Sequence, residues 1–215
     1  VANPKLWSVD SPNLYWVRTE IIQNGKVVDR TDSRFGIRYI ATNPNSGFYL
    51  NGVHTKLNGV CEHSDLGSLG METYQAAVDR RIRTLKKYGV NAIRTSHNPV
   101  SPEFIEACDR LGMLVFEEAF DQWLYSKNSD DYHNYFNKAA DGKTVVFDKA
   151  GNDNTNNDTS YIEVKREDLQ SNAERDIKAM VDRDKNAPCI FAWSTGNEIY
   201  DARYKHGENT LDMLT

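Results

Sequence analysis

The sequence predicts an α/β protein in which β-hairpins precede the first half of a (β/α)8 barrel. Two patterns support this prediction. Alternating residues and turn signals fill the first 54 positions, whereas short apolar strands alternate with amphipathic helices from residue 55 onward. With 215 residues, 39% of them hydrophobic, the chain is long enough for one to two globular domains.

Charge and hydropathy exclude several classes of protein. The net charge of −5 argues against a general electrostatic site for nucleic acid. No apolar run reaches the roughly 20 residues of a transmembrane helix, and the N-terminus lacks the basic and apolar regions of a signal peptide. The chain begins with Val1 instead of Met, so we expect a mature product or a piece of a longer protein.

The first part of the chain has the pattern of β-hairpins. Residues 14–22 alternate along a strand and are followed by Asn24 and Gly25. A type I′ turn favours this pair because both of its central positions take a positive φ. Asn51 and Gly52 predict a second hairpin between the apolar segments on either side of them.

Strands and helices alternate after the hairpins, and the helices have recognisable ends. Gly89 ends the first helix, as a glycine just past the last turn does. Ser101 and Pro102 predict the cap and the first residue of the next helix, which Gly112 ends. The predicted elements are a strand at 55–60, a helix at 72–88, a strand at 91–95, a helix at 102–111, a strand at 113–118, a helix at 163–184 and a strand at 189–193.

This order of elements indicates a parallel sheet, because apolar strands that alternate with helices are joined by right-handed crossovers. Four strands in about 160 residues correspond to half of a (β/α)8 barrel. A small open, doubly wound sheet is the alternative. Neither a G-x-G-x-x-G nor a G-x-x-x-x-G-K-[ST] motif is present, so nothing in the sequence supports nucleotide binding.

The three cysteines, Cys61, Cys108 and Cys189, are odd in number and far apart. This spacing argues against a disulfide framework and against a zinc site. Cys108 and Cys189 lie in apolar runs, and we predict that they are buried, reduced thiols. Unpaired cysteines favour a cytoplasmic location, and a secreted or periplasmic one stays open.

Polar and ionisable residues follow each of the four predicted strands. In a barrel the C-terminal ends of the strands converge on one mouth, where barrel enzymes hold their catalytic groups. Packing does not explain ionisable groups at four separate strand ends, so we interpret them as an active site. The segments are Cys61–Asp65, Arg94–Pro99, Glu117–Asp121 and Thr195–Glu198.

These segments resemble those of a known family. The stretches NGVHTKLNGVCEHSDLG, GVNAIRTSHNPVSPEF, LGMLVFEEAFDQW and APCIFAWSTGNEI are similar, in this order, to the barrel motifs of glycoside hydrolase family 2. DSRFGIR and the strand before it resemble the end of the immunoglobulin-like β-sandwich that precedes the barrel in that family. The resemblance implies that residues 1–42 end such a sandwich and that residues 43–215 form the N-terminal half of the TIM barrel, strands one to four.

The resemblance also implies a retaining β-glycosidase and assigns roles to residues of this chain. Glu198 matches the general acid/base, and Asn197 matches the neighbour that binds the sugar 2-hydroxyl. Arg94 matches the arginine that holds the nucleophile carboxylate. The other matches are to residues around the sugar: His63, His97, the buried carboxylate Glu118, and Asp121 and Trp123 of the sugar pocket.

Two parts of the family's active site are absent from this sequence. The family's nucleophile is a glutamate after the seventh barrel strand, whereas this chain ends at Thr215, just beyond the fourth. The N-terminal sugar-binding domain is also missing. We therefore expect the isolated chain to be inactive. A half-barrel has two unpaired sheet edges, so we also expect a homo-oligomer or association with the missing half.

The resemblance narrows the substrate and the cofactors. CEHSDLG and EEAFDQW are most like the motifs of the β-galactosidases, so a terminal β-galactoside is the predicted substrate. A β-glucuronide or a β-mannoside is the alternative within the family. Some galactosidases of the family bind Mg²⁺ near the acid/base, but AFDQWLY does not reproduce their ligands, so we predict no metal and no other cofactor.

Two other functions stay open on the sequence alone. His63 and Asp65, together with His97, have the spacing of a divalent-metal site in amidohydrolase-type barrels. The Gly-Asn-Glu sequence that ends at Glu198 would then have no role. The other alternative is a non-catalytic fragment that binds carbohydrate or serves a structural purpose.

Overall fold

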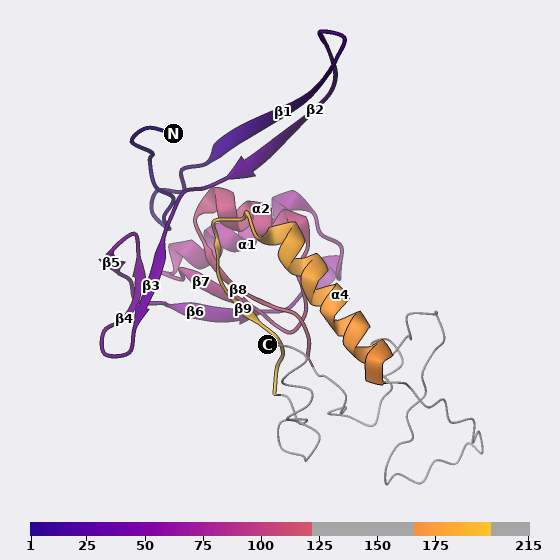
Figure 1. Cartoon of the computed structure of the whole chain (residues 1–215). Coiled ribbons are helices and arrows are strands. Elements are labelled where there is room, and N and C mark those ends of the chain that lie inside the picture. The colour runs from indigo at the N-terminus through magenta and orange to yellow at the C-terminus, as the bar shows by residue number, and fades with distance from the viewer. Residues whose placement is uncertain (122–165, 199–215) are drawn as a thin grey trace, which may run out of the picture. The chain divides into compact units, whose positions relative to one another are not determined.

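The structure is a computed structural model that describes residues 1–121 and 166–198 (Figure 1). The chain divides into two compact units. The first comprises Val1–Glu117 and Arg183–Trp193, and the second comprises Glu118–Asp182 and Ser194–Thr215. The first unit therefore contains the hairpins, two helices and most of a four-stranded sheet.

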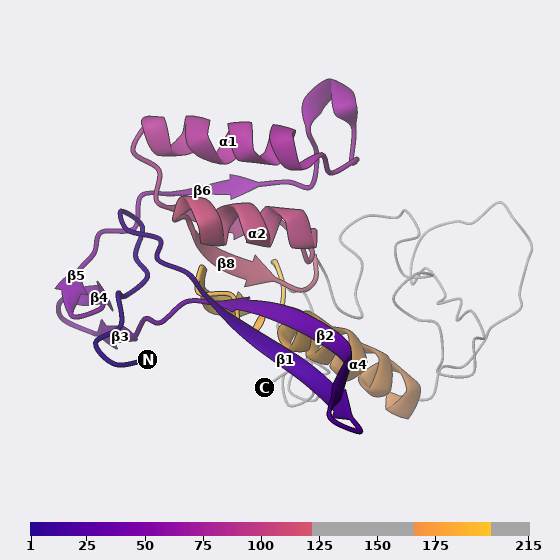
Figure 2. The ribbon, with the colours of Figure 1, turned by 90° about the horizontal axis from the view of Figure 1, so that it is seen from above.

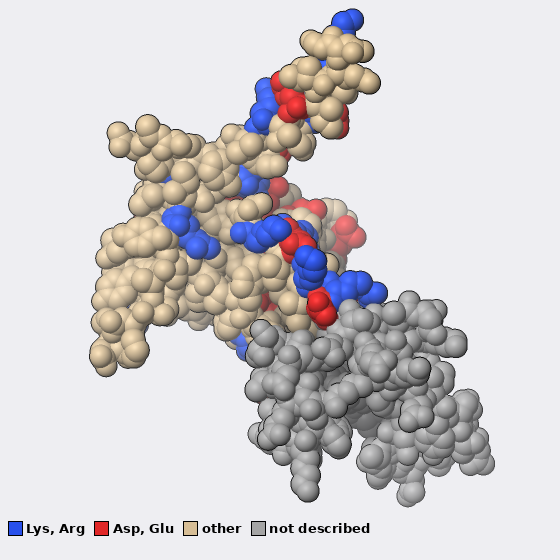
Figure 3. Space-filling model, viewed as in Figure 1, with Lys and Arg blue, Asp and Glu red and all other residues tan. Residues whose placement is uncertain are grey.

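The first predicted hairpin is confirmed. β1 (Tyr15–Gln23) and β2 (Lys26–Phe35) pair antiparallel and are joined by Asn24 and Gly25, whose φ angles are 52° and 74°. These positive angles are what the tight turn requires. Charged side chains lie along the hairpin (Figure 3), and they include the cross-strand ion pairs Arg18–Asp32 at 2.7 Å and Glu20–Arg30 at 3.1 Å.

The second predicted hairpin is also confirmed and belongs to a three-stranded sheet. β4 (Gly47–Leu50) pairs with β5 (Val53–His54) across Asn51 and Gly52, both of which have positive φ. β3 (Ile40–Asn43) pairs antiparallel with the other edge of β4.

A four-stranded sheet follows, and its strand order matches the chain order, as the barrel interpretation predicts. The strands are β6 (Gly59–Glu62), β7 (Ala92–Thr95), β8 (Leu114–Glu118) and β9 (Ile190–Ser194). The β6–β7 and β7–β8 pairs are parallel. The Val115 amide donates to the Cys189 carbonyl at 2.8 Å and so connects β8 with the segment that begins β9.

The first of these strands was predicted at 55–60 but lies at Gly59–Glu62. Residues 55–58 are held by bonds outside the sheet. The Thr55 amide donates to the Phe48 carbonyl at 2.9 Å, and the Asn58 amide donates to Asn91 Oδ1 at 2.8 Å. The sequence pattern of a few residues does not show whether their backbone amides bond within the four-stranded sheet or to other segments.

Helices α1 (Gln75–Lys87) and α2 (Pro102–Leu111) lie along the same side of β6 and β8 (Figure 2). A short 3₁₀ turn, η1 (Gly67–Leu69), precedes α1. The predicted cap of α2 is confirmed, because Ser101 Oγ accepts from the Phe104 amide at 3.3 Å. Gly112 ends α2 in the left-handed conformation, with a φ of 75°.

The core of the first unit lies where these helices meet the sheet. An N-terminal residue joins it: Trp7 is fully buried, and its Nε1 donates to the Asp109 carbonyl at 2.8 Å. The other buried members come mainly from α1, α2 and the strands, and they include Val78, Ile82, Ile93, Phe104, Ile105, Met113, Leu114 and Val115. Burying these side chains is the main source of stability for the unit.

The predicted buried thiols are confirmed. Cys108 and Cys189 are free and fully buried, and burial raises the pKa of each thiol well above its ordinary value. Cys61 is free and exposed. The backbone amide of Cys189 donates to Asp109 Oδ1 at 3.0 Å, while Arg34 Nη2 lies 3.2 Å from Asp109 Oδ2. This buried carboxylate therefore links β2, α2 and the start of β9 within the first unit.

The second unit contains most of helix α4 (Arg166–Asp184), which lies close to the predicted range of 163–184. Its exposed surface includes the ion pair of Lys178 with Asp182 at 2.8 Å, one helical turn apart. Residues 122–165, which lie between β8 and α4, are outside the described residues. None of the helices in the described part of the chain has the length and apolar content needed to cross a membrane.

Candidate active site

The ends of β6 and β7 bring together three of the predicted site residues in the first unit. His63 directly follows β6, Arg94 lies within β7, and His97 lies two residues beyond β7. The rings of His63 and His97 meet edge to face, with their centroids 5.4 Å apart. Arg94 is in register with Cys61 of β6, and its Nη1 lies 4.0 Å from the thiol Sγ.

Hydrogen bonds connect the segments that follow β6 and β7. The Ser96 amide donates to the Glu62 carbonyl at 2.9 Å, and Asn98 Nδ2 donates to Ser64 Oγ at 3.0 Å. Two turns that begin on neighbouring parallel strands are thus bonded to each other. Each histidine lies between the two bonded residues of its own turn, so the two bonds hold both histidines.

The second unit places three further predicted residues in short polar contacts. Glu118 is 1% exposed, and its Oε2 accepts from Ser194 Oγ at 2.8 Å. The Asn197 side chain donates from Nδ2 to Asp121 Oδ1 at 3.0 Å. The Asn197 backbone amide donates to the Phe120 carbonyl, also at 3.0 Å. Asn197 is therefore fixed at both its backbone and its side chain.

Glu198 follows this fixed asparagine and has an unusual backbone. Its φ is 46°, in the left-handed region that residues other than glycine seldom adopt. The residue is exposed. Such conformations cost on the order of 1–3 kcal/mol and cluster at functional sites, where the surrounding structure imposes them.

Glu117, the neighbour of Glu118 on β8, is fully buried and does not belong to these contacts. Its Oε1 lies 3.2 Å from Nη2 of Arg183, which also binds Asp184. Burial, together with the charge of Asp184, raises the pKa of Glu117 to about 8, although Arg183 opposes the shift. Its position is that of a structural carboxylate.

The structure thus forms two groups from the predicted residues. His63, Arg94 and His97 belong to the first unit. Glu118, Asp121, Asn197 and Glu198 belong to the second. Trp123 lies outside the described residues.

Two residues that contact these groups were not predicted. Ser194 binds Glu118 and occupies the last position of β9, so the pattern of polar strand ends contained a signal for it. Arg81 contacts the segment after β6 from helix α1. Its sequence position, in a run of basic residues on an amphipathic helix, is that of an ordinary surface arginine.

The described residues offer no group of three or more His, Cys, Asp or Glu side chains placed to hold a metal ion. Asp65, which the amidohydrolase alternative requires as a ligand, instead lies 3.9 Å from Arg81 and accepts from the Gly67 amide at 3.2 Å. Its carboxylate is therefore engaged by a cation and a backbone amide. The contacts of this segment do not favour that alternative.

Comparison with protein families identifies the fold to which these groups belong. The model described as the TIM barrel domain of the glycosyl hydrolases family 2 matches residues 42–214. A second model, described as glycosyl hydrolases family 2, matches residues 1–38. This chain belongs to glycosyl hydrolases family 2. The predicted fold class is confirmed: in this family 2 chain the end of the β-sandwich precedes the first half of the TIM barrel, with its parallel sheet and helices.

Relatives and solved structures of family 2 match almost the whole chain. It is 37% identical over 213 residues to the β-galactosidase BoGH2A of Bacteroides ovatus, covering 99% of this chain and 21% of that protein. It is 38% identical over 200 residues to a putative β-glucuronidase of Formosa agariphila, covering 93% of this chain and 16% of that protein. The crystal structure of a family 2 member from Bacteroides cellulosilyticus is 36% identical, with a TM-score of 0.77, and the match covers 98% of this chain and 23% of that one. The chain thus spans about a fifth of the length of the curated relatives that it matches.

Proposed function

We propose that this chain is the part of a retaining β-glycosidase that carries the general acid/base, with Glu198 in that role. The observation that carries the proposal is the setting of Glu198 after β9. Asn197 is bonded at both its backbone and its side chain, whereas Glu198 is exposed on a backbone with positive φ. An acid/base that serves first a glycosidic oxygen and then a water needs an accessible carboxyl on a fixed backbone.

The proposed mechanism uses Glu198 twice. It first donates a proton to the leaving oxygen while a second carboxylate attacks the anomeric carbon, and it then takes a proton from the water that releases the sugar. The two carboxyl groups of a retaining enzyme are about 5–5.5 Å apart. In the family pattern the second is a glutamate after the seventh strand, a part that this chain does not contain. We therefore propose that the chain is inactive alone and acts within a longer polypeptide, called the parent polypeptide below.

The other predicted residues have supporting roles in this proposal. Asn197 binds the sugar 2-hydroxyl, and its bond to Asp121 fixes which way its amide faces. Arg94 keeps the incoming nucleophile ionised, because a nearby cation favours a carboxylate. His63 and His97 contact the sugar. Glu118 lies beneath it, where Ser194 holds its carboxyl in place.

For the substrate we propose a terminal β-galactoside. CEHSDLG and EEAFDQW resemble the galactosidase motifs, and one of the relatives that match most of this chain is the β-galactosidase BoGH2A. A putative β-glucuronidase matches to a similar degree, so a β-glucuronide is the competing substrate within the same mechanism. The two sugars differ in configuration at C4 and in the group at C6, a hydroxymethyl in the galactoside and a carboxylate in the glucuronide, and a direct comparison of their hydrolysis decides between them.

The test is hydrolysis of nitrophenyl β-galactoside, β-glucuronide and β-mannoside by the 215-residue chain and by the parent polypeptide. We expect the parent polypeptide to prefer the galactoside and the isolated chain to show no turnover. Glu198→Gln should lower kcat on the galactoside by about 10²- to 10⁴-fold, the usual contribution of a general acid/base. Glu174→Gln, an exposed glutamate of α4, is the matched control and should leave kcat unchanged.

The leaving group makes this test specific to acid catalysis. A dinitrophenyl leaving group is acidic enough to depart without protonation, so we expect Glu198→Gln to slow the sugar-transfer step far less on that substrate than on an alkyl galactoside. An equal loss on both substrates would show that Glu198 is not the acid. Turnover by the isolated chain would contradict the assignment of the nucleophile to the missing strands, and Glu118 or Asp121 would then become the candidates.

A further inference from the structure

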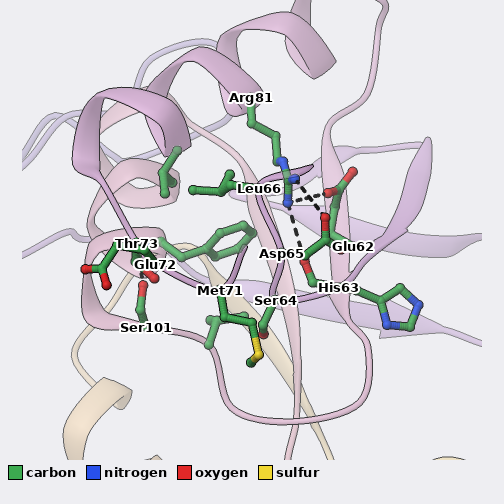
Figure 4. Close-up of a pocket in the computed structure, with 13 residues that line it drawn as sticks. Glu62, His63, Ser64, Asp65, Leu66, Met71, Glu72, Thr73, Arg81 and Ser101 are labelled. Atoms are coloured by element: carbon green, nitrogen blue, oxygen red, sulfur yellow. Dashed lines mark hydrogen bonds and ion pairs between the residues drawn. The ribbon is translucent and has the colours of Figure 1, made fainter. Parts of the chain in front are cut away.

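Helix α1 sends one side chain to the segment Glu62–Asp65, called the His63 loop here. The Arg81 guanidinium is directed toward this loop (Figure 4). Its Nη1 lies 3.0 Å from Glu62 Oε2 and 3.4 Å from the His63 carbonyl, and its Nη2 lies 3.9 Å from Asp65 Oδ1. One side chain thus contacts both carboxylates of the loop and the backbone between them. It also borders a cavity of about 40 Å³ between the loop and the helices.

The rest of the loop is fixed to its neighbours, and the imidazole of His63 extends away from these bonds (Figure 4). The Asp65 amide donates to the His63 carbonyl at 2.8 Å, so this carbonyl accepts from two donors. Ser64 Oγ accepts from Asn98 at 3.0 Å. On its far side, the ring of His63 meets that of His97 at an angle of 89°. The exposed imidazole therefore stands on a loop whose other members are bonded.

Arg81 is itself carried on a rigid base. Val78 and Ile82, its neighbours on the inner face of α1, are 2% and 0% exposed. Near the end of the helix, Lys86 Nζ donates to the carbonyls of Val9, Leu111 and Gly112. The start of the Arg81 side chain is therefore fixed to the core, so the guanidinium can impose a position on the His63 loop.

The charges indicate what this contact achieves. Glu62 and Asp65 are both acidic side chains, and they share one cation, the Arg81 guanidinium. Without that cation the two carboxylates would lose the counter-charge that they share, and like charges in one loop repel each other. Relief of the repulsion would move the backbone between them, which is the backbone of His63.

We propose that Arg81 is a positioning residue for His63: it holds the His63 loop in the one conformation that places the imidazole against His97 and the sugar. The inference rests on the proposed function, in which His63 contacts the sugar. Arg81 itself contacts no substrate. A guanidinium engages two carboxylates and a carbonyl at once through its planar set of donors, whereas a lysine ammonium, a single point charge, holds only part of this set.

The kinetic test uses the parent polypeptide. A displacement of about 1 Å in an active site can cost about 100-fold, so we expect Arg81→Gln to lower kcat by about 10- to 100-fold with little change in KM. Arg81→Lys should recover part of the loss. Arg83→Gln is the matched control, because Arg83 lies on the same helix, is 62% exposed and pairs only loosely, at 4.0 Å, with Asp79. It should leave kcat unchanged.

A double mutant separates positioning from general support of the fold. If Arg81 acts through His63, then Arg81→Gln combined with His63→Asn should be no slower than His63→Asn alone, because the second change removes what the first one disturbs. Losses that multiply would overturn the proposal. So would a kcat for Arg81→Gln equal to that of Arg83→Gln.

Hydrogen–deuterium exchange gives a readout that does not depend on turnover. In the parent polypeptide with Arg81→Gln we expect faster exchange in the peptide that covers residues 61–70 and unchanged exchange in the peptides of β7 and β8. Unchanged exchange at 61–70 would overturn the proposal. If the unaltered parent hydrolyses none of the three glycosides, the proposed function fails, and the exchange experiment still decides whether Arg81 holds the loop.

Discussion

Replacing Glu117 with glutamine should change how the stability of this chain depends on pH. Glu117 is fully buried, and none of the described residues donates a hydrogen bond to its Oε2. Asp184 lies close enough to raise the Glu117 pKa by its charge and by hydrogen bonding, and Arg183 Nη2 bonds to Oδ2 of Asp184. These contacts favour a Glu117 that keeps its proton, because burial and the charge of Asp184 both disfavour a second carboxylate at this position.

The sign and size of the effect follow from the pKa of Glu117. The folded chain holds this proton up to about pH 8, whereas the unfolded chain releases it near 4.5. Between these values the native state binds more protons, so stability falls as the pH rises, by about 1.4 kcal/mol per pH unit at the limit. A glutamine keeps a donor for Asp184 and does not titrate. Between pH 5 and pH 8 the free energy of unfolding of the Glu117→Gln variant should therefore rise by about 4 kcal/mol relative to that of the unaltered chain.

Urea unfolding at pH 5, 6.5 and 8 measures this difference, with Glu174→Gln on the surface of α4 as the control. We expect the curves of the variant and the unaltered chain to converge or cross as the pH rises, and the control to run parallel to the unaltered chain. A variant that is destabilised equally at pH 5 and pH 8 would refute the reasoning. It would mean that Glu117 is ionised throughout and serves Arg183 as a charged partner.

Two smaller predictions test how helices α1 and α2 are held. Ser101→Ala removes the side-chain cap of α2 and should lower the free energy of unfolding by about 1 kcal/mol. Ser101→Asn should restore the cap and the stability. No loss in the alanine variant would show that the bond to the Phe104 amide contributes nothing. Lys86→Met keeps the apolar stem but takes the donor from three carbonyls, so urea unfolding should show a loss of about 1–3 kcal/mol. An unchanged midpoint would indicate that water replaces the ammonium at little cost.

The parts of the fold that the sequence predicted well are those decided within a few residues. Asn24 and Gly25 form their turn because both tolerate a positive φ, and Ser101 caps α2 through an amide three residues away. Gly112 ends the same helix in the left-handed conformation. In each case the chemistry that decides the structure is contained in the local sequence, so the prediction needs no knowledge of distant partners.

The features that the sequence did not predict depend on partners far along the chain. Trp7 is buried because α2 offers its indole a carbonyl more than a hundred residues away. The first barrel strand begins later than predicted because the amide of Asn58 donates to the side chain of Asn91 instead of to a neighbouring strand. Arg81 resembles any exposed arginine of an amphipathic helix until the loop after β6 is placed beside it. Periodicity indicates which face of an element is buried, but it does not identify the residues that pack against that face.

Glu117 and Glu118 are two neighbouring residues of the candidate site region whose different surroundings composition alone does not predict. Both end the same apolar strand, and composition alone treats them alike. Successive side chains of a strand point to opposite faces, so one of the two glutamates must face the helices and the other the opposite side of the sheet. Glu117 meets Arg183, near the end of α4, and Glu118 meets the hydroxyl of Ser194. The resemblance selected Glu118 for the sugar site, and the contacts of Glu117 explain why that residue does not take the role: Glu117 is fully buried and paired with Arg183, beside Asp184, and is therefore committed to the structure.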